Sequence, residues 1–158
     1  MAGTSFRLYF PAQSADAALK ESIAKIDAQP TMVSNSTATV LVVEDEERML
    51  HALEKILAKQ GYKVLKASDG EMALDTYERH NETIDVVLLD MGLPKMSGRD
   101  VLLRMKNRNP DVKVVIASGH FEDEMNSDID QAGVKHLLRK PYMPDEVMKV
   151  LQSLINRS

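Results

Sequence analysis

Residues 84–98 read IDVVLLDMGLPKMSG, a hydrophobic run that stops at Asp90 and is followed by a turn containing Gly and Pro. The run Ile84–Leu89 is rich in Val and Leu, as expected of a parallel strand that is covered on both faces. This stretch predicts a buried strand with a carboxylate at its carboxyl end.

Two similar runs precede this stretch and two follow it. They are Thr39–Val43, Lys63–Ala67, Val112–Ala117 and Lys135–Leu138. The segments between the runs carry apolar residues at helical spacing, which predicts alternating strands and helices. We therefore expect an α/β fold with a five-stranded parallel sheet, doubly wound as (βα)5 in the flavodoxin-like strand order 2-1-3-4-5. The helix expected near Glu122 to Ala132 has few large apolar residues and should be the least firmly docked.

Composition narrows the class of protein. The 158 residues are 44% apolar and carry a formal charge of −4, so the chain has no excess of Lys and Arg for binding nucleic acid. It has no cysteine, no signal-peptide pattern and no apolar run near the roughly 20 residues of a membrane span. We expect a cytoplasmic protein with no membrane contact of its own, although a longer parent protein could be membrane-anchored.

Polar side chains follow four of the five predicted strands. They are Glu44, Asp45, Asp90, Ser118 and Lys140. Because the carboxyl ends of parallel strands meet at one edge, we expect these groups to converge. Clustered carboxylates repel one another unless a cation joins them, and Mg²⁺ prefers such oxygen ligands together with a phosphate. Lys140 and Ser118 suit the oxygens of a phosphoryl group.

Each of these residues also has an ordinary structural interpretation. The carboxylates and Ser118 could cap the helices that follow them, and an isolated lysine is usually solvated. Five suitable groups after four different strands are not explained by capping alone. The combination favours a phosphoryl-transfer site.

Four segments carry a resemblance to a known family. They are VLVVEDE (40–46), VVLLDMGLPKMSG (86–98), VVIASG (114–119) and LLRKPY (137–142). Over about residues 38–156 the sequence resembles the receiver domain of bacterial-type response regulators of two-component systems. The resemblance implies that Asp90 accepts a phosphoryl group from a phosphohistidine. It also implies a Mg²⁺ site made by Asp45, Asp90 and the backbone carbonyl of Gly92, with Glu44 assisting through a water molecule.

The resemblance extends to the remaining site residues. Ser118 and Lys140 are expected to contact the phosphoryl oxygens, and a cis peptide bond is expected before Pro141. Phosphorylation would switch the face formed by the fourth helix, the fifth strand and the last helix. The expected partner is the phospho-accepting domain of a histidine kinase or a histidine phosphotransfer protein.

The sequence departs from the family pattern at several positions. Glu44 stands where Asp is common, and Leu137 stands where many members carry an aromatic switch residue that moves with Ser118. Gly92 and His120 occupy positions that tune the lifetime of the phosphoaspartate in the family. Gly92 offers no side chain for this, and His120 is either a surface residue or a modulator of dephosphorylation.

The amino-terminal segment has a different character. Residues 3–12 read GTSFRLYFPA and resemble the last strand of the ATP-binding domain of histidine kinases. We interpret residues 1–12 as a remnant of such a domain, 13–36 as a linker with a short helix near Ala15 to Ala28, and 37–158 as the receiver. The chain would then be the C-terminal receiver of a hybrid histidine kinase. Its only catalysis would be its own phosphorylation and dephosphorylation, since the kinase core lies outside it.

Other functions remain open from the sequence. One alternative is a stand-alone single-domain response regulator, and another is a receiver that binds partners without phosphorylation. A third is a small phosphatase with Asp90 as nucleophile, although enzymes of the haloacid-dehalogenase type carry a second Asp where this chain has Gly92. No output domain follows the predicted receiver in this chain, so we expect no DNA binding.

Overall fold

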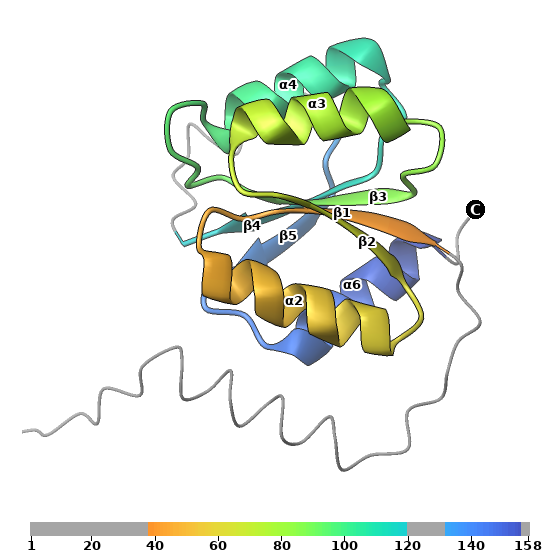
Figure 1. Cartoon of the computed structure of the whole chain (residues 1–158). Coiled ribbons are helices and arrows are strands. Elements are labelled where there is room, and N and C mark those ends of the chain that lie inside the picture. Colours follow the sequence, from red (N-terminus) through yellow and green to blue (C-terminus); the bar gives the residue numbers. More distant parts are fainter. Residues whose placement is uncertain (1–37, 120–131, 156–158) are drawn as a thin grey trace, which may run out of the picture.

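The residues that the structure describes form one parallel β-sheet between two pairs of helices (Figure 1). The computed structural model describes residues 38–119 and 132–155. Its strands are β1 (Thr39–Val43), β2 (Lys63–Ala67), β3 (Val86–Asp90), β4 (Val114–Ser118) and β5 (His136–Arg139). Its helices are α2 (Glu47–Lys59), α3 (Gly70–His80), α4 (Gly98–Arg108) and α6 (Pro144–Ile155).

The strand order is β2-β1-β3-β4-β5, and every neighbouring pair is parallel. This confirms the predicted flavodoxin-like (βα)5 order. Helices α3 and α4 cover one face of the sheet, and α2 and α6 cover the other (Figure 1). The central strands β1, β3 and β4 are buried along their whole length, which explains why their sequences are so uniformly apolar.

Successive residues of each central strand serve opposite sides of the core. In β1, Leu41 and Val43 pack into the cluster under α3 and α4, whereas Val40 and Val42 pack into the cluster under α2 and α6. This alternation follows from the two-residue period of a strand. Full burial of each such side chain stabilises the fold by about 1.5–3 kcal/mol. The two clusters together cover both faces of the sheet.

Two helices begin at well-formed side-chain caps. The Asp69 carboxylate accepts a hydrogen bond from the Met72 amide at 2.8 Å, at the start of α3. The Ser97 hydroxyl accepts one from the Asp100 amide at 3.2 Å, at the start of α4. Such caps satisfy amides that lack a partner within the helix. The start of α4 is therefore well defined next to the end of β3.

The bounds of three strands differ from the predicted ones. The strand predicted at Ile84–Leu89 is Val86–Asp90, because Asp85 is occupied at the start of β1. Its carboxylate accepts the Thr39 amide at 2.7 Å, and its amide donates to the Thr39 carbonyl at 2.9 Å. β3 instead continues through Asp90, so the carboxylate is carried by the strand itself.

Strands β4 and β5 also differ from their predicted bounds by one or two residues. The strand predicted at Val112–Ala117 is Val114–Ser118, since the Val112 amide donates to the Asn109 carbonyl at 3.2 Å in the turn after α4. The strand predicted at Lys135–Leu138 is His136–Arg139, which pairs in register with Val115–Ser118.

The predicted helix near 122–132, the linker helix and the amino-terminal strand lie outside the described residues. Among the described helices, none has both the length and the apolar character needed to cross a bilayer.

Candidate functional site

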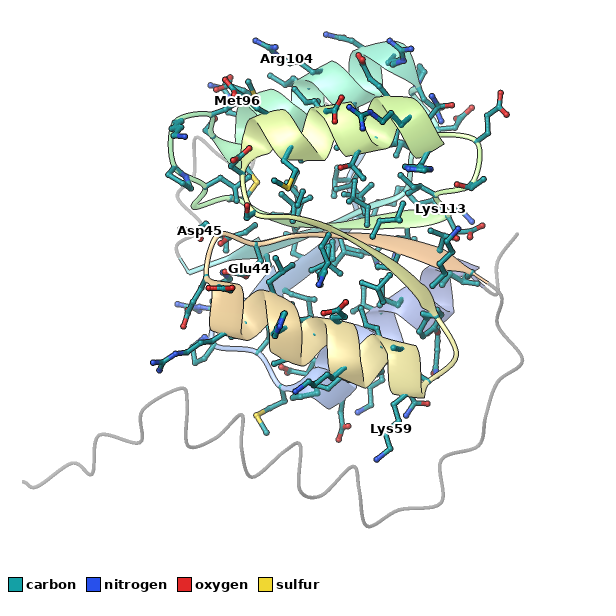
Figure 2. The ribbon with its side chains drawn as sticks, viewed as in Figure 1. Glu44, Asp45, Lys59, Met96, Arg104 and Lys113 are labelled. Atoms are coloured by element: carbon teal, nitrogen blue, oxygen red, sulfur yellow. The ribbon has the colours of Figure 1, made fainter. Side chains whose placement is uncertain are left out.

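The five residues predicted to follow strands lie at the carboxyl edge of the sheet. Glu44 and Asp45 directly follow β1, and Figure 2 shows both at this end of the molecule. Asp90 is the last residue of β3, Ser118 is the last residue of β4, and Lys140 directly follows β5. Because β1, β3, β4 and β5 are consecutive in the sheet, their ends form one continuous rim. The expectation that these groups converge is thus met by the topology.

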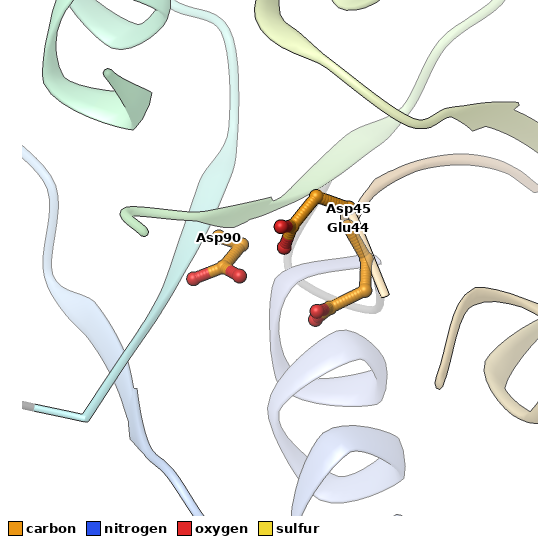
Figure 3. A group of neighbouring side chains, drawn as sticks. All are labelled: Glu44, Asp45 and Asp90. Carbon is orange, nitrogen blue, oxygen red and sulfur yellow. The ribbon is translucent and has the colours of Figure 1, made fainter. Parts of the chain in front are cut away.

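Three carboxylates of this rim form a compact cluster (Figure 3). Ligand oxygens of Glu44, Asp45 and Asp90 all lie within 4.8 Å of one another. Glu44 and Asp90 are buried, at 3% and 5% exposure, whereas Asp45 is exposed. The cluster therefore reaches from the sheet interior to solvent, with Asp45 as its exposed member.

Lys140 bridges the two buried carboxylates. Its ammonium nitrogen lies 2.7 Å from Oδ2 of Asp90, and 3.1 and 2.8 Å from the two Oε atoms of Glu44. The Lys140 side chain is 26% exposed, against 4% for Glu44 and 7% for Asp90. Charge-assisted hydrogen bonds in such a poorly solvated place are strong, and they fix the Asp90 carboxylate in one orientation.

The protonation equilibria of this group point in one direction. Burial raises the pKa of the Glu44 carboxyl, and the hydrogen bond and charge of Lys140 oppose the rise only in part. Burial by itself lowers the pKa of Lys140, but the hydrogen bonds to Asp90 and Glu44 outweigh it, so this pKa is raised. Both shifts favour the protonated form, the Glu44 shift mainly because of burial and the Lys140 shift because of its two carboxylate partners. Three carboxylates and one ammonium group leave this rim with an excess of negative charge.

Backbone contacts hold Asp90 from the other side. Oδ1 of Asp90 accepts a hydrogen bond from the Gly92 amide at 3.0 Å. A Cβ atom on Gly98 would collide with the Asp90 carbonyl oxygen and would lie 2.6 Å from Cα of Met91. The first residue of α4 is therefore pressed against the peptide that follows the acceptor candidate, and only glycine allows this approach.

A pocket of about 480 Å³ opens in front of Asp90. Lys140 and Ser118 line it from the ends of β5 and β4, and Gly92, Gly119 and Arg99 line it from the adjoining loops and the first turn of α4. Ser118 is 5% exposed, and its carbonyl accepts the Lys140 amide at 2.7 Å. The pocket therefore brings an acid, a hydroxyl residue and two cations together.

Sequence reasoning missed four of the residues that line the pocket, namely Met91, Gly119, Ser97 and Arg99. The pattern Ser97 to Asp100 ahead of an apolar helix is a recognisable capping signal. That signal locates the start of a helix but not its closeness to Asp90, which depends on the contact at Gly98. In the sequence alone, Arg99 cannot be distinguished from an ordinary charged residue on the solvent-exposed face of a helix.

The remaining predicted residues have mixed outcomes. The Lys140–Pro141 peptide bond is cis, as the resemblance implied. Leu137 lies on β5 and is 43% exposed. Gly92 lies beside Asp90, and the ligand role of its carbonyl stays a prediction. His120 lies outside the described residues.

Comparisons with known proteins agree with this geometry. Residues 40–152 match the model of the response regulator receiver domain. A receiver domain structure from Clostridium thermocellum is 32% identical with a TM-score of 0.71, covering 76% of this chain and 95% of that one. A chain of the CheX-CheY-BeF3-Mg²⁺ complex from Borrelia burgdorferi is 28% identical with a TM-score of 0.69, covering 74% and 88%.

One curated relative extends beyond the receiver region. The sensor kinase CckA of Brucella abortus is 29% identical over 98% of this chain. The match spans only 17% of that kinase, so most of the relative has no counterpart here. The family match, the strand order and the acidic rim agree, and this chain belongs to the response regulator receiver domain family of two-component systems.

Proposed function

We propose that the protein accepts a phosphoryl group on Asp90 and thereby switches a signalling surface. The observation that carries this proposal is the position of Asp90: a buried carboxylate held by Lys140 and the Gly92 amide, at the floor of an open pocket. Fixed donors on both carboxylate oxygens keep the group oriented. An oriented nucleophile beside a cation is what phosphoryl transfer requires.

The transfer is a displacement at phosphorus. A carboxylate oxygen of Asp90 forms a bond to phosphorus while the bond from phosphorus to the donor's imidazole nitrogen breaks and the imidazole keeps the electron pair. Lys140 balances the charge on the phosphoryl oxygens, and Ser118 offers a hydroxyl at the end of β4. Both groups act on charge that is delivered to the pocket with the phosphoryl group.

The acidic rim also fits a magnesium ion. Glu44, Asp45 and Asp90 present hard oxygen ligands within 4.8 Å of one another, and three carboxylates beside one Lys140 ammonium group leave an excess of negative charge. Asp45, Asp90 and the Gly92 carbonyl would hold the ion, with Glu44 nearby. When bound, it would supply neutralisation of the phosphoryl oxygens. The similar Borrelia chain comes from a complex with BeF3 and Mg²⁺, which supports the same chemistry here.

We further propose that the partner is a phosphohistidine on a kinase or on a phosphotransfer protein. The mouth of the pocket is open, so a bulky side chain on another protein can reach Asp90. The response surface would include β5, where Leu137 is 43% exposed. An aliphatic residue at this position gives a weaker rotameric switch than an aromatic one, so we assign more of the response to movement of the helix predicted near Glu122 to Ala132.

The parent protein is proposed to be a hybrid histidine kinase. Residues 1–12 would be the end of its ATP-binding domain, 13–36 a linker and 37–158 the receiver. The stretch GTSFRLYFP and the alignment with a sensor kinase over 98% of this chain both support this origin, because that alignment continues outside the receiver match at 40–152. Sequencing the gene upstream of Gly3 tests it: an ATP-binding kinase domain in frame is expected, and its absence would favour a stand-alone regulator.

The acceptor role is tested by phosphorylation in solution. The protein is incubated with Mg²⁺ and acetyl phosphate, and intact mass is followed over time. One added phosphoryl group is expected in the wild type and none in Asp90→Asn. An unchanged mass in the wild type, or an equal gain in Asp90→Asn, would contradict the assignment.

A further inference from the structure

A second cationic side chain, that of Arg99, lines the pocket in front of Asp90. Lys140 makes three contacts with Asp90 and Glu44, so its charge already serves the carboxylates. Arg99 lines the same pocket from the second residue of α4 and has an exposed side chain. The two cations enter from different elements, one after β5 and one after the β3–α4 loop.

The start of α4 keeps Arg99 close to the acceptor. Gly98 packs so tightly on the Asp90–Met91 backbone that a Cβ atom would not fit. The Ser97 hydroxyl accepts the Asp100 amide at 3.2 Å and donates to the Asp100 carboxylate at 2.8 Å. These contacts fix the helix backbone on both sides of residue 99. The position of Arg99 beside the pocket is thus set by the fold, and its side chain is exposed.

The two glycines of the pocket leave its mouth wide. A Cβ atom on Gly92 would lie 3.6 Å from Oδ1 of Asp90, so any larger residue there would project beside the acceptor. A Cβ atom on Gly119 would meet no atom within 4 Å. Neither position fills the space between Asp90 and the rim. A phosphoryl donor can therefore occupy it within reach of a long side chain from α4.

We propose that Arg99 binds the phosphoryl oxygens of the incoming donor from the α4 side of the pocket. This inference rests on the proposed acceptor role of Asp90 and names a further residue for that reaction. A guanidinium group suits the task because it donates two parallel hydrogen bonds to phosphate oxygens and stays charged at any physiological pH.

Acetyl phosphate is a suitable donor for the test. A carboxylate oxygen of Asp90 forms a bond to phosphorus as the bond from phosphorus to the acetate oxygen breaks. Acetate leaves with the electron pair, and nothing is oxidised or reduced. The Asp90 carboxylate carries one negative charge and the aspartyl phosphate up to two, so the charge at Asp90 becomes more negative by about one unit. Arg99 contributes by holding the donor before transfer, so its effect should fall on donor binding more than on the maximal rate.

Arg104 provides a matched control on the same helix. It is an exposed arginine of α4 that does not line the pocket, and Figure 2 shows it on the outer side of the helix. Arg104→Ala changes the net charge as much as Arg99→Ala does. Any difference between the two variants therefore reports position and not overall charge.

The experiment measures the initial rate of Asp90 phosphorylation against acetyl phosphate concentration for wild type, Arg99→Ala, Arg99→Lys and Arg104→Ala. In Arg99→Ala the half-saturating concentration should rise about three- to tenfold, the size of one charge-assisted contact at a partly solvated site, with little change in maximal rate. Arg99→Lys should recover part of the loss and Arg104→Ala should match wild type. Added salt should shrink the difference between wild type and Arg99→Ala.

A second readout does not depend on turnover. In labelled wild-type protein, the Nε–H resonance of Arg99 should shift when Mg²⁺ and beryllofluoride are added, and that of Arg104 should not. Equal half-saturating concentrations in Arg99→Ala and Arg104→Ala, with an unmoved Arg99 resonance, would overturn the inference while leaving the acceptor role intact. Failure of the wild type itself to be phosphorylated would instead overturn the acceptor role, and this inference with it.

Discussion

The ammonium nitrogen of Lys140 lies 2.7 Å from Oδ2 of Asp90, across 50 positions of sequence. The same nitrogen contacts both carboxylate oxygens of Glu44, which lies 96 positions away. One side chain thus ties together the ends of β1, β3 and β5. Because two of the three charged groups are buried, the stability of this rim and its chemistry depend on the same contacts.

Lys140→Met should destabilise the protein markedly in the absence of divalent cations. The variant keeps the apolar stem but leaves two buried carboxylates without their cation, which costs about 3 kcal/mol of unfolding free energy. Chemical denaturation followed by circular dichroism measures the loss. Added Mg²⁺ should recover part of it, because it neutralises the same carboxylates.

Lys66→Met is the matched control for burial. The Lys66 ammonium lies 2.7 Å from Glu54, the same separation as in the site, but these side chains are 36% and 34% exposed. An exposed pair contributes less than about 1 kcal/mol. Equal losses in Lys66→Met and Lys140→Met would show that burial of the rim carboxylates has no energetic consequence.

Gly98→Ala should impair both folding and phosphorylation. The added methyl group would collide with the Asp90 carbonyl, so either α4 or the end of β3 must move, at a cost of about 1–3 kcal/mol. Thermal denaturation gives the loss of stability, and the rate of phosphorylation reports displacement of Asp90. Gly119→Ala, where the added atom has no neighbour within 4 Å, should keep wild-type stability. A Gly98→Ala variant as stable as Gly119→Ala would mean that this close approach does not exist.

The sequence predicted the sheet well because its central strands are buried on both faces. Strands β1 and β2 begin and end where periodicity places them, and the strand order follows from short right-handed crossovers. The ends of β3 and β4 differ because local hydrogen bonds compete with the ladder. The Asp85 carboxylate accepts a hydrogen bond from the Thr39 amide, and the Val112 amide donates one to the Asn109 carbonyl in a turn. The pattern of apolar residues in the sequence does not reveal such hydrogen bonds.

The site was predictable to the extent that topology alone brings residues together. The backbone topology alone brings the carboxyl ends of neighbouring parallel strands together. The five site residues that follow these strands could therefore be predicted to lie close together from the sequence. The bidentate contact of Lys140 with Glu44 and the approach of Arg99 depend on side-chain reach and on the packing of Gly98. These are tertiary details that spacing along the chain does not encode.

Asp45→Asn should weaken magnesium binding without affecting the fold. Asp45 is the exposed member of the acidic cluster, so its charge is not needed for packing, but its oxygen is a proposed ligand. The dissociation constant for Mg²⁺, measured by calorimetry, should rise about tenfold or more. Asp75→Asn, which removes an exposed carboxylate paired with Arg79 on α3, should bind Mg²⁺ like wild type. If both variants behave alike, Asp45 is not a ligand.

Tyr142→Phe should reduce the loss of unfolding free energy that the protein shows as the pH rises above about 10. Tyr142 is 8% exposed, and burial, aided by the charges of Glu44, Asp90 and Glu46, raises the pKa of its phenol. The unfolded chain then loses this proton near pH 10 while the folded protein keeps it. The folded state is therefore fully stabilised below about pH 10 and loses stability as pH rises above it, by up to about 1.4 kcal/mol per pH unit.

Denaturation at several pH values tests this. Between pH 7 and 9 the two proteins should run in parallel and differ little, since the Tyr142 hydroxyl has no hydrogen-bond partner among the described residues. Above pH 10 the wild type should decline more steeply than Tyr142→Phe. The same slope in both would show that this phenol titrates normally in the folded protein.

The central claim is that Glu44, Asp45, Asp90, Ser118 and Lys140 form one phosphoryl-accepting pocket. The most direct measurement records backbone amide NMR spectra before and after Mg²⁺ with beryllofluoride, a mimic of the phosphoryl group. We predict shifts centred on residues 90, 118 and 140 in the wild type and none in a folded Asp90→Asn. A wild-type spectrum without shifts at these residues, or identical shifts in Asp90→Asn, would contradict the account.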